Sequence, residues 1–233
     1  MNPPNFPWLS EKERFYFPSP EKSRHSSIIA WGGNLSPGML LSAYEQGLFP
    51  WYGENDPLLW HSPDPRCVIF PEKLRVSKSM KKILRQGKFR ITFDEDFKGV
   101  IRNCAEIKRP GQDGTWIDND IIQAYTELHR LGWAHSAEAR CGDVLAGGCY
   151  GIRLGKVFFG ESMFSLVPNA SKAAFLSLAR ILFDDGVALI DCQVPNPHLF
   201  SLGAEEISRK DFLELLGKNL ADPGSGKVRC GLN

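Results

Sequence analysis

Two polar side chains in an otherwise apolar run, Asp191 and Gln193, are the first candidates for chemistry in this sequence. The run extends from Ala188 to Val194 and is typical of a buried strand. Because successive side chains of a strand point to opposite faces, Asp191 and Gln193 are expected on one face and Cys192 on the other. A buried carboxylate and a buried amide each need hydrogen-bond partners. The pair therefore indicates either a structural polar network or a site, and both interpretations stay open at this point.

A third candidate is Glu161, which ends a predicted strand between large apolar residues at 158–159 and 163–164. A carboxylate in that position can bind a cation beside an apolar pocket. A single glutamate at a strand end more often faces water, with the neighbouring phenylalanines in the core. The hypothesis of a site therefore depends on Glu161 lying close to the strand that carries Asp191.

Basic residues follow one another from Lys73 to Arg90 with no acidic residue among them. Within this stretch Ser77 is the predicted N-cap of a helix that extends to about Gln86. The i, i+3, i+4, i+7 spacing places four cations on one face of that helix: Lys78, Lys81, Lys82 and Arg85. The net charge of the chain is only +1, so this patch, not the total charge, indicates a nucleic-acid partner. The patch is either a surface that contacts the phosphates of a nucleic acid or a solvated helix face.

Four aromatic residues lie in loop-like sequence contexts: Trp51, Tyr52, Trp60 and Trp116. An exposed ring in a loop can stack on a nucleobase. Packing in the core is the alternative for any single tryptophan. Loop tryptophans in a chain with a basic helix favour contact with a nucleic acid.

Motifs of the common nucleotide-binding and hydrolytic enzymes are absent from the sequence. It has no G-K-[ST] phosphate loop, no G-x-G-x-x-G, no G-x-S-x-G and no H-E-x-x-H. The six cysteines form no C-x-x-C pair and the five histidines do not complete a zinc site with them, so we expect reduced thiols and no metal. Segment 1–31 lacks the order of a signal peptide and no apolar run reaches membrane-spanning length, which favours a cytoplasmic protein.

The elements that must position these residues fall into two parts. Residues 1–65 are rich in aromatics, Pro and Gly and carry one clear helix, with Ser36 as its N-cap and Gly47 at its end. Beyond the prolines at 62–65, alternating strands and amphipathic helices predict a larger domain over 66–233. The predicted strands are 67–70, 89–93, 134–140, 144–151, 156–161 and 187–194, and the predicted helices are 77–86, 120–131, 169–183 and 210–220.

The order of these elements predicts the fold class. Three strands joined by turns at Gly142 and Gly155 form an antiparallel meander, which is followed by a helix, a buried strand and a last helix. This order resembles an acetyltransferase-like (GNAT-like) core, an α/β (α+β) arrangement with a mostly antiparallel sheet. We therefore expect a small N-terminal domain followed by an acetyltransferase-like C-terminal domain, and the analogy by itself carries no function.

Five short blocks, in order along the chain, resemble one known family. They are Trp-His-Ser-Pro-Asp-Pro-Arg at 60–66, Gly-Thr-Trp-Ile at 114–117, Gly-Glu-Ser-Met-Phe-Ser at 160–165, Asn-Ala-Ser-Lys at 169–172 and Leu-Ile-Asp-Cys-Gln-Val at 189–194. Together they closely resemble the bacterial leucyl/phenylalanyl-tRNA–protein transferases, and the likeness extends from about Gly32 through Arg209. Several blocks at family spacing are far more specific than any one of them.

The resemblance implies an enzyme that transfers leucine or phenylalanine, and methionine less readily, from aminoacyl-tRNA to the N-terminal Arg or Lys of another protein. This transfer marks the acceptor for degradation by the N-end rule. The implied enzyme needs no cofactor and is expected to be a monomer. Its larger domain binds the 3′ end of the tRNA in place of acyl-coenzyme A, and this chain carries no R-x-x-G-x-G/A loop of the kind that coenzyme A users have.

The resemblance also implies roles for individual residues. Asp191 and Gln193 match the catalytic pair of the family, and Glu161 belongs to the same site, where it would recognise the cationic end of the acceptor. Trp51 and Trp116 match the pair that stacks on the terminal adenosine. The residues that match an apolar pocket for the transferred side chain are Cys149, Phe158, Met163, Phe175 and Leu178.

Two positions depart from the family pattern. Members often have Trp where this chain has His61, which is expected to alter a local contact, and Met where it has Cys149, which is expected to enlarge the pocket. Neither departure touches the implied catalytic pair.

In the implied reaction the α-amino group of the acceptor attacks the ester carbonyl of the aminoacyl-tRNA. Gln193 has no titratable proton and can only orient the amine, whereas Asp191 can polarise this arrangement or accept a proton. Two other functions remain alternatives at this point. One is an acetyltransferase that uses acetyl-coenzyme A, and the other is a non-catalytic RNA-binding module in which Asp191 and Gln193 are structural.

Overall fold

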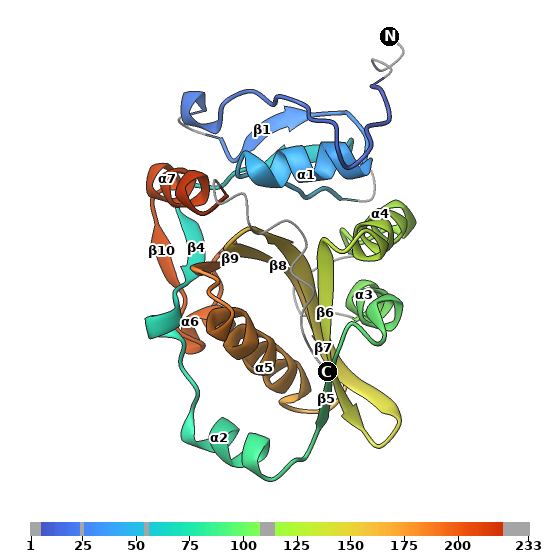
Figure 1. The fold of residues 1–233 in the computed structure, drawn as a ribbon, viewed down its shortest axis with the longest axis vertical. Helices are drawn as coiled ribbons and strands as arrows, with labels where there is room; N and C mark the ends of the chain where they lie inside the picture. The colour runs from blue at the N-terminus through green and yellow to red at the C-terminus, as the bar shows by residue number, and fades with distance from the viewer. Residues whose placement is uncertain (1–5, 24–25, 54–55, 108–114, 221–233) are drawn as a thin grey trace.

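The computed structural model describes residues 6–23, 26–53, 56–107 and 115–220. Within them the strands form two sheets (Figure 1). A three-stranded sheet has the order β1-β3-β2, and a seven-stranded sheet has the order β10-β4-β9-β8-β7-β6-β5. The larger sheet is antiparallel except for the pair β8 and β9. The predicted mixed fold, with a small N-terminal part and a mostly antiparallel sheet, is confirmed.

The N-terminal part is built around helix α1 (Pro37–Glu45). Its other elements are η1 (Pro20–Lys22), β1 (Ile28–Trp31), β2 (Phe49–Pro50) and β3 (Leu59–His61). Helix α1 begins after Ser36, as predicted, and the chain turns at Gly47, whose φ of +78° suits a residue without a side chain. Residues 37–44 are all buried, so α1 lies inside a core.

The chain passes from the small sheet into the large one between His61 and Arg66, and the Asp64–Pro65 peptide bond between them is cis. One hydrophobic cluster nevertheless spans both parts, and it contains Met39 of α1 together with Phe159 of the larger sheet. Helix α1 also contacts helices from the larger part. The two parts therefore share a core. Their division into separate domains, 1–65 and 66–233, stays a prediction.

The antiparallel meander consists of three long strands beside an edge strand. They are β6 (Ala134–Cys141), β7 (Val144–Leu154) and β8 (Val157–Ser165), with β5 (Arg90–Phe93) next to β6. Gly142 and Gly155 form the turns with φ values of +58° and +56°, a region that favours glycine. The three predicted strands and both turns are confirmed.

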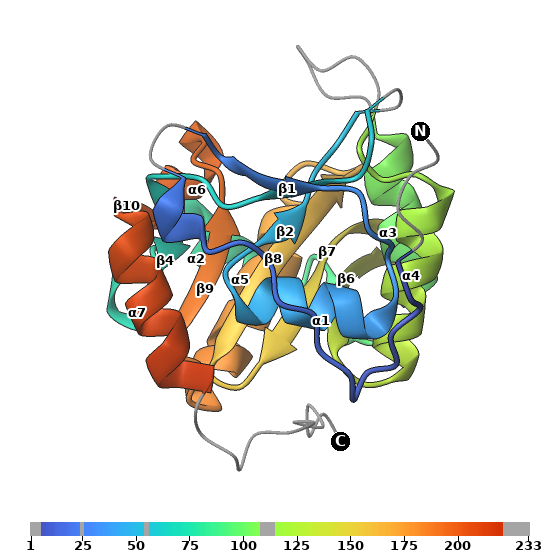
Figure 2. The same cartoon turned by 90° about the horizontal axis from the view of Figure 1, so that it is seen from above.

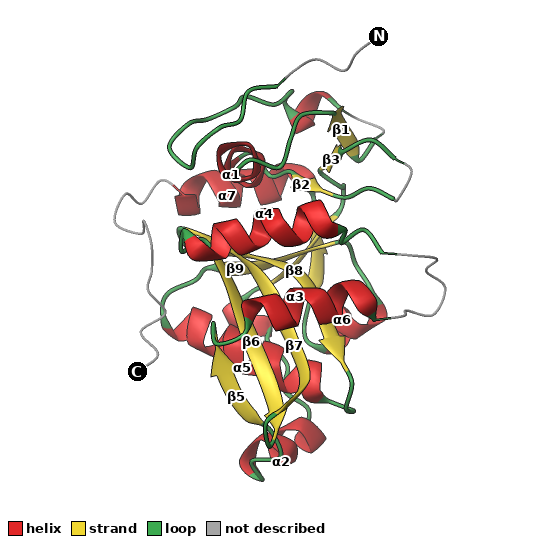
Figure 3. Ribbon diagram, turned by 90° about the vertical axis from the view of Figure 1, so that its right-hand side faces the viewer, coloured by secondary structure: helices red, strands yellow, loops and turns green. Residues whose placement is uncertain are grey.

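Helices cover both faces of the larger sheet (Figure 3). One face carries α3 (Phe97–Glu106) and α4 (Asn119–Arg130), and the other carries α2 (Lys78–Arg85), α5 (Ala170–Asp184) and α6 (Pro197–Ser201), with η2 (Pro71–Lys73) before α2. The side chains of Asp96 and Asp118 cap α3 and α4 by accepting hydrogen bonds from backbone N–H groups. The residue pattern does not predict α3, because Gly99 and two adjacent β-branched residues lower its helix propensity.

Helix α5 connects β8 to β9 (Leu189–Gln193), and a crossover of this kind makes the two neighbouring strands parallel. The paired residues are Val157 with Leu189, Phe158 with Ile190 and Phe159 with Asp191. The described pairing ends there, although β8 continues to Ser165. The two strands therefore diverge beyond Phe159 and Asp191.

The C-terminal elements return the chain to the N-terminal part. Strands β4 (Arg66–Ile69) and β10 (Glu205–Ile207) extend the sheet beyond β9, and α7 (Arg209–Leu220) follows them (Figure 2). Phe212 and Leu216 of α7 are buried in the cluster that also contains the residues of α1. Among the described residues, no helix combines the length and the apolar character that a membrane crossing needs.

Candidate active site

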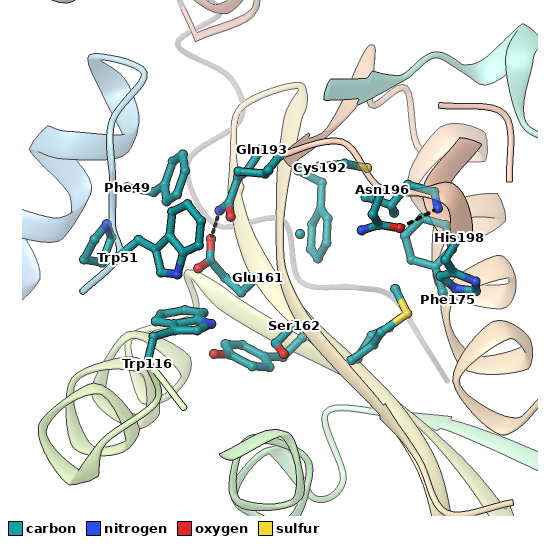
Figure 4. Close-up of a pocket in the computed structure, with 18 residues that line it drawn as sticks. Phe49, Trp51, Trp116, Glu161, Ser162, Phe175, Cys192, Gln193, Asn196 and His198 are labelled. Atoms are coloured by element: carbon teal, nitrogen blue, oxygen red, sulfur yellow. Dashed lines mark hydrogen bonds between the residues drawn. The ribbon is translucent and has the colours of Figure 1, made fainter. Parts of the chain in front are cut away.

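A cavity of about 370 Å³ lies where β8 and β9 diverge (Figure 4). Its walls come from residues 160–163 of β8, residues 192–194 at the end of β9, the segment that follows β2, and helices α5 and α6. The residues nominated from the sequence that line it are Trp51, Trp116, Cys149, Phe158, Glu161, Met163, Phe175 and Gln193. The fold thus gathers these residues from distant parts of the chain around one space.

Gln193 and Glu161 meet in the cavity wall. Nε2 of Gln193 donates a hydrogen bond of 2.8 Å to Oε1 of Glu161 (Figure 4). Oε2 of Glu161 accepts a hydrogen bond from the hydroxyl of Tyr125 at 3.2 Å, and the hydroxyl of Tyr44 bonds to both Tyr125 and Glu161. Because Tyr44 belongs to α1 and Tyr125 to α4, Glu161 is held from both parts of the protein.

Burial raises the pKa of Glu161 from its ordinary value of 4.5 to about 8, and the negative charge of Asp191 contributes to the rise. The hydrogen bonds from the two tyrosines and from Gln193 stabilise the carboxylate and oppose that shift. Glu161 is therefore a group in the cavity wall that changes its charge close to neutral pH. Carboxylates with such raised pKa values concentrate in functional sites.

Asp191 lies behind the cavity wall and is 0% exposed. Arg66 binds both of its oxygens, with Nε 2.8 Å from Oδ1 and Nη2 2.6 Å from Oδ2. The backbone N–H of Gln193 donates a further hydrogen bond of 2.9 Å to Oδ1. Asp191 therefore reaches the cavity through Gln193.

Arg66 is the main residue of the site that the sequence analysis misses. It is 0% exposed, and its Nη1 donates to the carbonyl oxygen of Gly47 at 3.1 Å. Its Cζ lies 4.8 Å from the ring centroid of Phe49 and 4.4 Å from that of Phe212. One side chain thus connects the N-terminal part, α7 and the strand that carries Asp191. The sequence does contain a reason to nominate Arg66. A buried carboxylate needs a cationic partner, and Arg66 is the last residue of one of the five blocks that resemble the family.

The end of β9 departs from regular strand geometry at Gln193, whose φ is +62°. A residue other than glycine rarely adopts this left-handed conformation, which costs about 1–3 kcal/mol. A β-bulge in the pairing with β4 directly precedes it. Regular strand periodicity therefore breaks at this point: Asp191 is bound by Arg66 behind the cavity, whereas Cys192 and Gln193 both line the cavity.

Trp51 and Trp116 lie next to each other on one side of the cavity (Figure 4). Trp51 follows β2 and is 42% exposed, and Trp116 precedes α4 and is partly buried. The hydroxyl of Tyr52 donates a hydrogen bond of 3.0 Å to Asp118, which joins the two loops. Both tryptophans therefore line the cavity from two loops that are joined to each other.

Trp60 and His61 of β3 are both buried, and His61 contacts Trp51. Trp60 is 1% exposed, and its Nε1 donates to the carbonyl oxygen of Gly32 at 2.8 Å. The ring of His61 lies 5.4 Å from that of Trp51, and burial lowers the pKa of His61. The alternative of core packing is therefore correct for Trp60, and the local contact of His61 is with Trp51.

The opposite side of the cavity is apolar. Cys149 of β7 is paired with Met163 on the neighbouring strand β8, and both line the cavity. Phe158 and Phe175 complete this wall. Leu178 is 1% exposed and belongs to the same core cluster as Phe175, but it does not line the cavity. Leu178 therefore supports the wall from behind, in contrast to its expected place in the pocket.

Two polar residues that the sequence analysis does not nominate, Asn196 and His198, lie near Phe175 (Figure 4). Oδ1 of Asn196 accepts a hydrogen bond of 2.9 Å from the N–H of Leu199 and so caps α6. Burial lowers the pKa of His198, and the cation of Lys172 adds to this effect. The sequence gives little indication of these two residues, because a helix as short as α6 has no recognisable periodic pattern.

The basic residues of α2 lie away from the cavity. The helix forms as predicted, with Oγ of Ser77 accepting a hydrogen bond from the N–H of Met80, whose side chain is buried. The cations on its outer face are all exposed: Lys78, Lys81, Lys82 and Arg85. Helix α2 contacts α5 and lies at the end of the molecule opposite α1 (Figure 1). Contact of this face with a nucleic acid stays a prediction.

Comparison with known proteins identifies the family. The family model described as leucyl/phenylalanyl-tRNA protein transferase matches residues 68–217, and the model of the N-terminal domain of that transferase matches residues 33–64. A leucyl/phenylalanyl-tRNA–protein transferase from Anaeromyxobacter sp. is 53% identical over 89% of this chain and 88% of its own length. A protein of the same name from Myxococcus xanthus is 47% identical over 92% of this chain and 92% of its own length. One from Pseudomonas putida is 49% identical over 94% of this chain and 96% of its own length. The chain therefore belongs to the leucyl/phenylalanyl-tRNA–protein transferase family and is a transferase.

Proposed function

We propose that this protein transfers leucine or phenylalanine, and methionine less readily, from aminoacyl-tRNA to the N-terminal Arg or Lys of acceptor proteins, which are then degraded by the N-end rule. The observation that carries the proposal is the cavity between β8 and β9, where Glu161 and Gln193 lie between two tryptophans and an apolar wall. A nucleobase, an apolar side chain and a cationic acceptor each have a complementary surface there. Family membership supports the same proposal.

The proposed reaction is aminolysis of an ester. The α-amino nitrogen of the acceptor attacks the aminoacyl carbonyl carbon, the ester C–O bond breaks, and the ribose 3′ oxygen leaves with a proton. The ester is already an activated acyl donor, so the reaction needs no ATP. The protein has to orient the amine, assist the transfer of its proton and stabilise the oxyanion.

Gln193 is the residue proposed to orient the amine. Its amide nitrogen donates to Glu161, which leaves the carbonyl oxygen of the side chain as an acceptor for an amine N–H. Asp191 holds the backbone N–H of Gln193, while Arg66 engages both carboxylate oxygens. Of the two roles that the sequence leaves open for Asp191, this geometry favours positioning over acceptance of a proton.

Glu161 is proposed to bind the cationic side chain of the acceptor. Burial disfavours the ionised carboxylate, and an incoming guanidinium or ammonium group would compensate that charge. An acceptor with N-terminal Ala has no cationic side chain, so the same contact discriminates against it.

A transfer assay with purified protein, radiolabelled leucyl-tRNA and two peptides that differ only in N-terminal Arg or Ala tests this proposal. Label in the Arg peptide alone is the expected result. Label in both peptides would contradict the proposed requirement for an N-terminal Arg or Lys in the acceptor. No label in either peptide, from folded protein that still binds the tRNA, would contradict the activity. Parallel reactions with phenylalanyl-tRNA and methionyl-tRNA measure the order of the donors.

Replacement of Lys81 and Lys82 together by alanine should weaken tRNA binding and reduce its dependence on salt. Both side chains are exposed on α2, and each lost phosphate contact reduces the slope of log K against log salt by about 0.9. Titrations at several salt concentrations measure the slope. The pair Lys210→Ala and Lys218→Ala on α7 removes the same charge elsewhere and should leave the slope unchanged. Equal slopes for the α2 variant and the unmodified protein would mean that α2 presents a solvated face.

Cys149→Met should shift the donor preference from phenylalanine toward leucine. Cys149 is 4% exposed and lines the apolar wall opposite Met163, so a longer side chain there fills part of the pocket. A phenyl ring loses more room than an isobutyl group, and size differences in an apolar pocket are worth about 1–3 kcal/mol. The ratio of kcat/KM for phenylalanyl-tRNA to that for leucyl-tRNA should fall by about tenfold. An unchanged ratio would contradict the placement of the transferred side chain against Cys149.

A further inference from the structure

The thiols of Cys67 and Cys192 hydrogen-bond to each other across the neighbouring strands β4 and β9. In the register of this antiparallel pair, Cys67 faces Gln193 and Val68 faces Asp191. Cys192 is therefore the extra residue of the β-bulge and lies beside Cys67. Both side chains pack against the core cluster on the α5 face of the sheet, so they point to the same side.

The two thiols differ in exposure. Cys67 is 0% exposed, whereas Cys192 is partly exposed and lines the cavity that contains Glu161 and Gln193. A small reagent that enters the cavity meets Cys192 first. Cys67 is shielded but in contact with Cys192, which is the arrangement of an attacked thiol and a resolving thiol.

The hydrogen bond between the two thiols shifts their pKa values in opposite directions. It lowers the pKa of Cys67, to which Arg66 contributes a smaller effect in the same direction, and it raises the pKa of Cys192. Transfer of the Cys192 proton to the Cys67 sulfur along this hydrogen bond would make Cys192, which lines the cavity, the attacking thiolate.

We propose that Cys67 and Cys192 are a peroxide-sensitive pair that closes to a reversible disulfide. The Cys192 thiolate attacks one oxygen of hydrogen peroxide, the O–O bond breaks, and the leaving hydroxide takes a proton to give water and a sulfenic acid on Cys192. The Cys67 sulfur then attacks the sulfenic sulfur, the S–O bond breaks, and hydroxide leaves as water with the Cys67 proton. The two thiols lose two electrons and one peroxide becomes two waters.

Closure of this disulfide should also stop transfer. An S–S bond of about 2.05 Å is shorter than any contact between two thiols, so Cys192 must move toward β4. Gln193 follows directly, with a left-handed φ and with its N–H held by Asp191. A shift of Cys192 therefore displaces the amide of Gln193 from Glu161. This consequence rests on the proposed function, whereas formation of the disulfide does not.

Peptide mapping tests the disulfide itself. Full-length protein treated with hydrogen peroxide and then alkylated without reduction should carry two alkyl groups fewer than protein alkylated without peroxide treatment, because the two disulfide-bonded sulfurs cannot react. A digest should contain one joined pair of peptides, carrying Cys67 and Cys192, that dithiothreitol separates. Absence of this pair, or joining to a different cysteine, would overturn the proposal.

Two variants provide matched controls for the map. Cys141→Ser removes another partly exposed thiol, at the end of β6, and should give the same joined peptides as the unmodified protein. Cys67→Ser should give no joined pair and should instead allow dimedone to trap a sulfenic acid on Cys192. Trapping only at cysteines other than Cys192 would count against the proposal.

The transfer assay measures the consequence separately. Oxidised protein should lose activity by about tenfold or more and regain it with dithiothreitol. Cys67→Ser, whose side chain lies outside the cavity, should be active before oxidation. Full activity of protein that contains the mapped disulfide would contradict the claim that the disulfide stops transfer. If the reduced protein transfers nothing, the proposed function fails, while the peptide map still decides whether the disulfide forms.

Discussion

Replacement of Asp191 by alanine should lower the single-turnover transfer rate by at least about tenfold and destabilise the fold by about 3–5 kcal/mol. Arg66 and Asp191 are both 0% exposed and are joined by two hydrogen bonds. Without the carboxylate, the guanidinium stays between Phe49 and Phe212 with no opposite charge. Gln193 also loses the acceptor of its backbone N–H, so the group proposed to orient the amine becomes mobile.

A double variant separates the structural effect from the functional one. Arg66→Met with Asp191→Leu removes both charges and should recover most of the stability, because apolar residues often replace a buried ion pair without loss. Transfer should stay low, because Leu cannot accept a hydrogen bond from Gln193. Denaturant unfolding and single-turnover assays measure the two effects. Recovery of transfer together with stability would mean that Asp191 has only a structural role.

Glu127→Ala is the matched control for loss of one carboxylate from an ion pair. Glu127 accepts two hydrogen bonds from Arg130 on the exposed surface of α4. Exposed pairs contribute about 0.2–1 kcal/mol, so this variant should remain stable and active. An equally small loss of stability for Asp191→Ala would show that Arg66 finds another partner.

Glu161→Gln should reduce transfer to an N-terminal Arg peptide by at least about tenfold, while it stabilises the folded protein at pH 8. Gln preserves the shape of the side chain and removes the charge proposed to bind the acceptor. The effect should appear mainly as a raised KM for the Arg peptide, because the lost contact is with the acceptor. A rate and a KM equal to those of the unmodified protein would contradict the proposal that Glu161 binds the cationic side chain of the acceptor.

The stabilisation follows from the raised pKa of Glu161, which is about 8 in the folded protein against an ordinary 4.5. The folded state therefore binds this proton more tightly than the unfolded state does. The resulting contribution to stability is complete below pH 4.5 and is lost as the pH rises to about 8. Glu161→Gln has no such loss, so its advantage in unfolding free energy should grow over this pH range. Glu95→Gln, on the exposed surface, should show no comparable growth.

Local patterns predict the longer elements of this fold. Helix α5 and strand β7 have enough periodic residues to be recognised, and Ser77 marks the beginning of α2 correctly. Short elements such as β1, β3, α6 and β10 are not predicted. Their residues adopt strand or helix geometry because of distant partners, as when Ile207 of β10 pairs with Arg66 of β4. A segment of three to five residues contains too little periodicity to reveal such a partner.

The arrangement of strand β9 shows the limit of a periodic pattern. Alternation separates Asp191 from Cys192, but it does not predict the bulge or the φ of +62° at Gln193. Bulges depend on the pairing of two strands and have no signature in one strand alone. As a result, Cys192 lies in the cavity wall and Asp191 lies behind it.

The sequence by itself determined the long helices and strands, the α+β class and the family, and through the family eight of the residues that line the cavity. These properties follow from local periodicity, capping residues and ordered blocks, which can be recognised without coordinates. Only the tertiary structure decided the partners of those residues: Arg66 for Asp191 across 125 positions, and two buried tyrosines for Glu161. The physical reason is that burial, and with it the pKa of Glu161 and the cost of an unpaired Arg66, depends on which distant surfaces enclose a side chain.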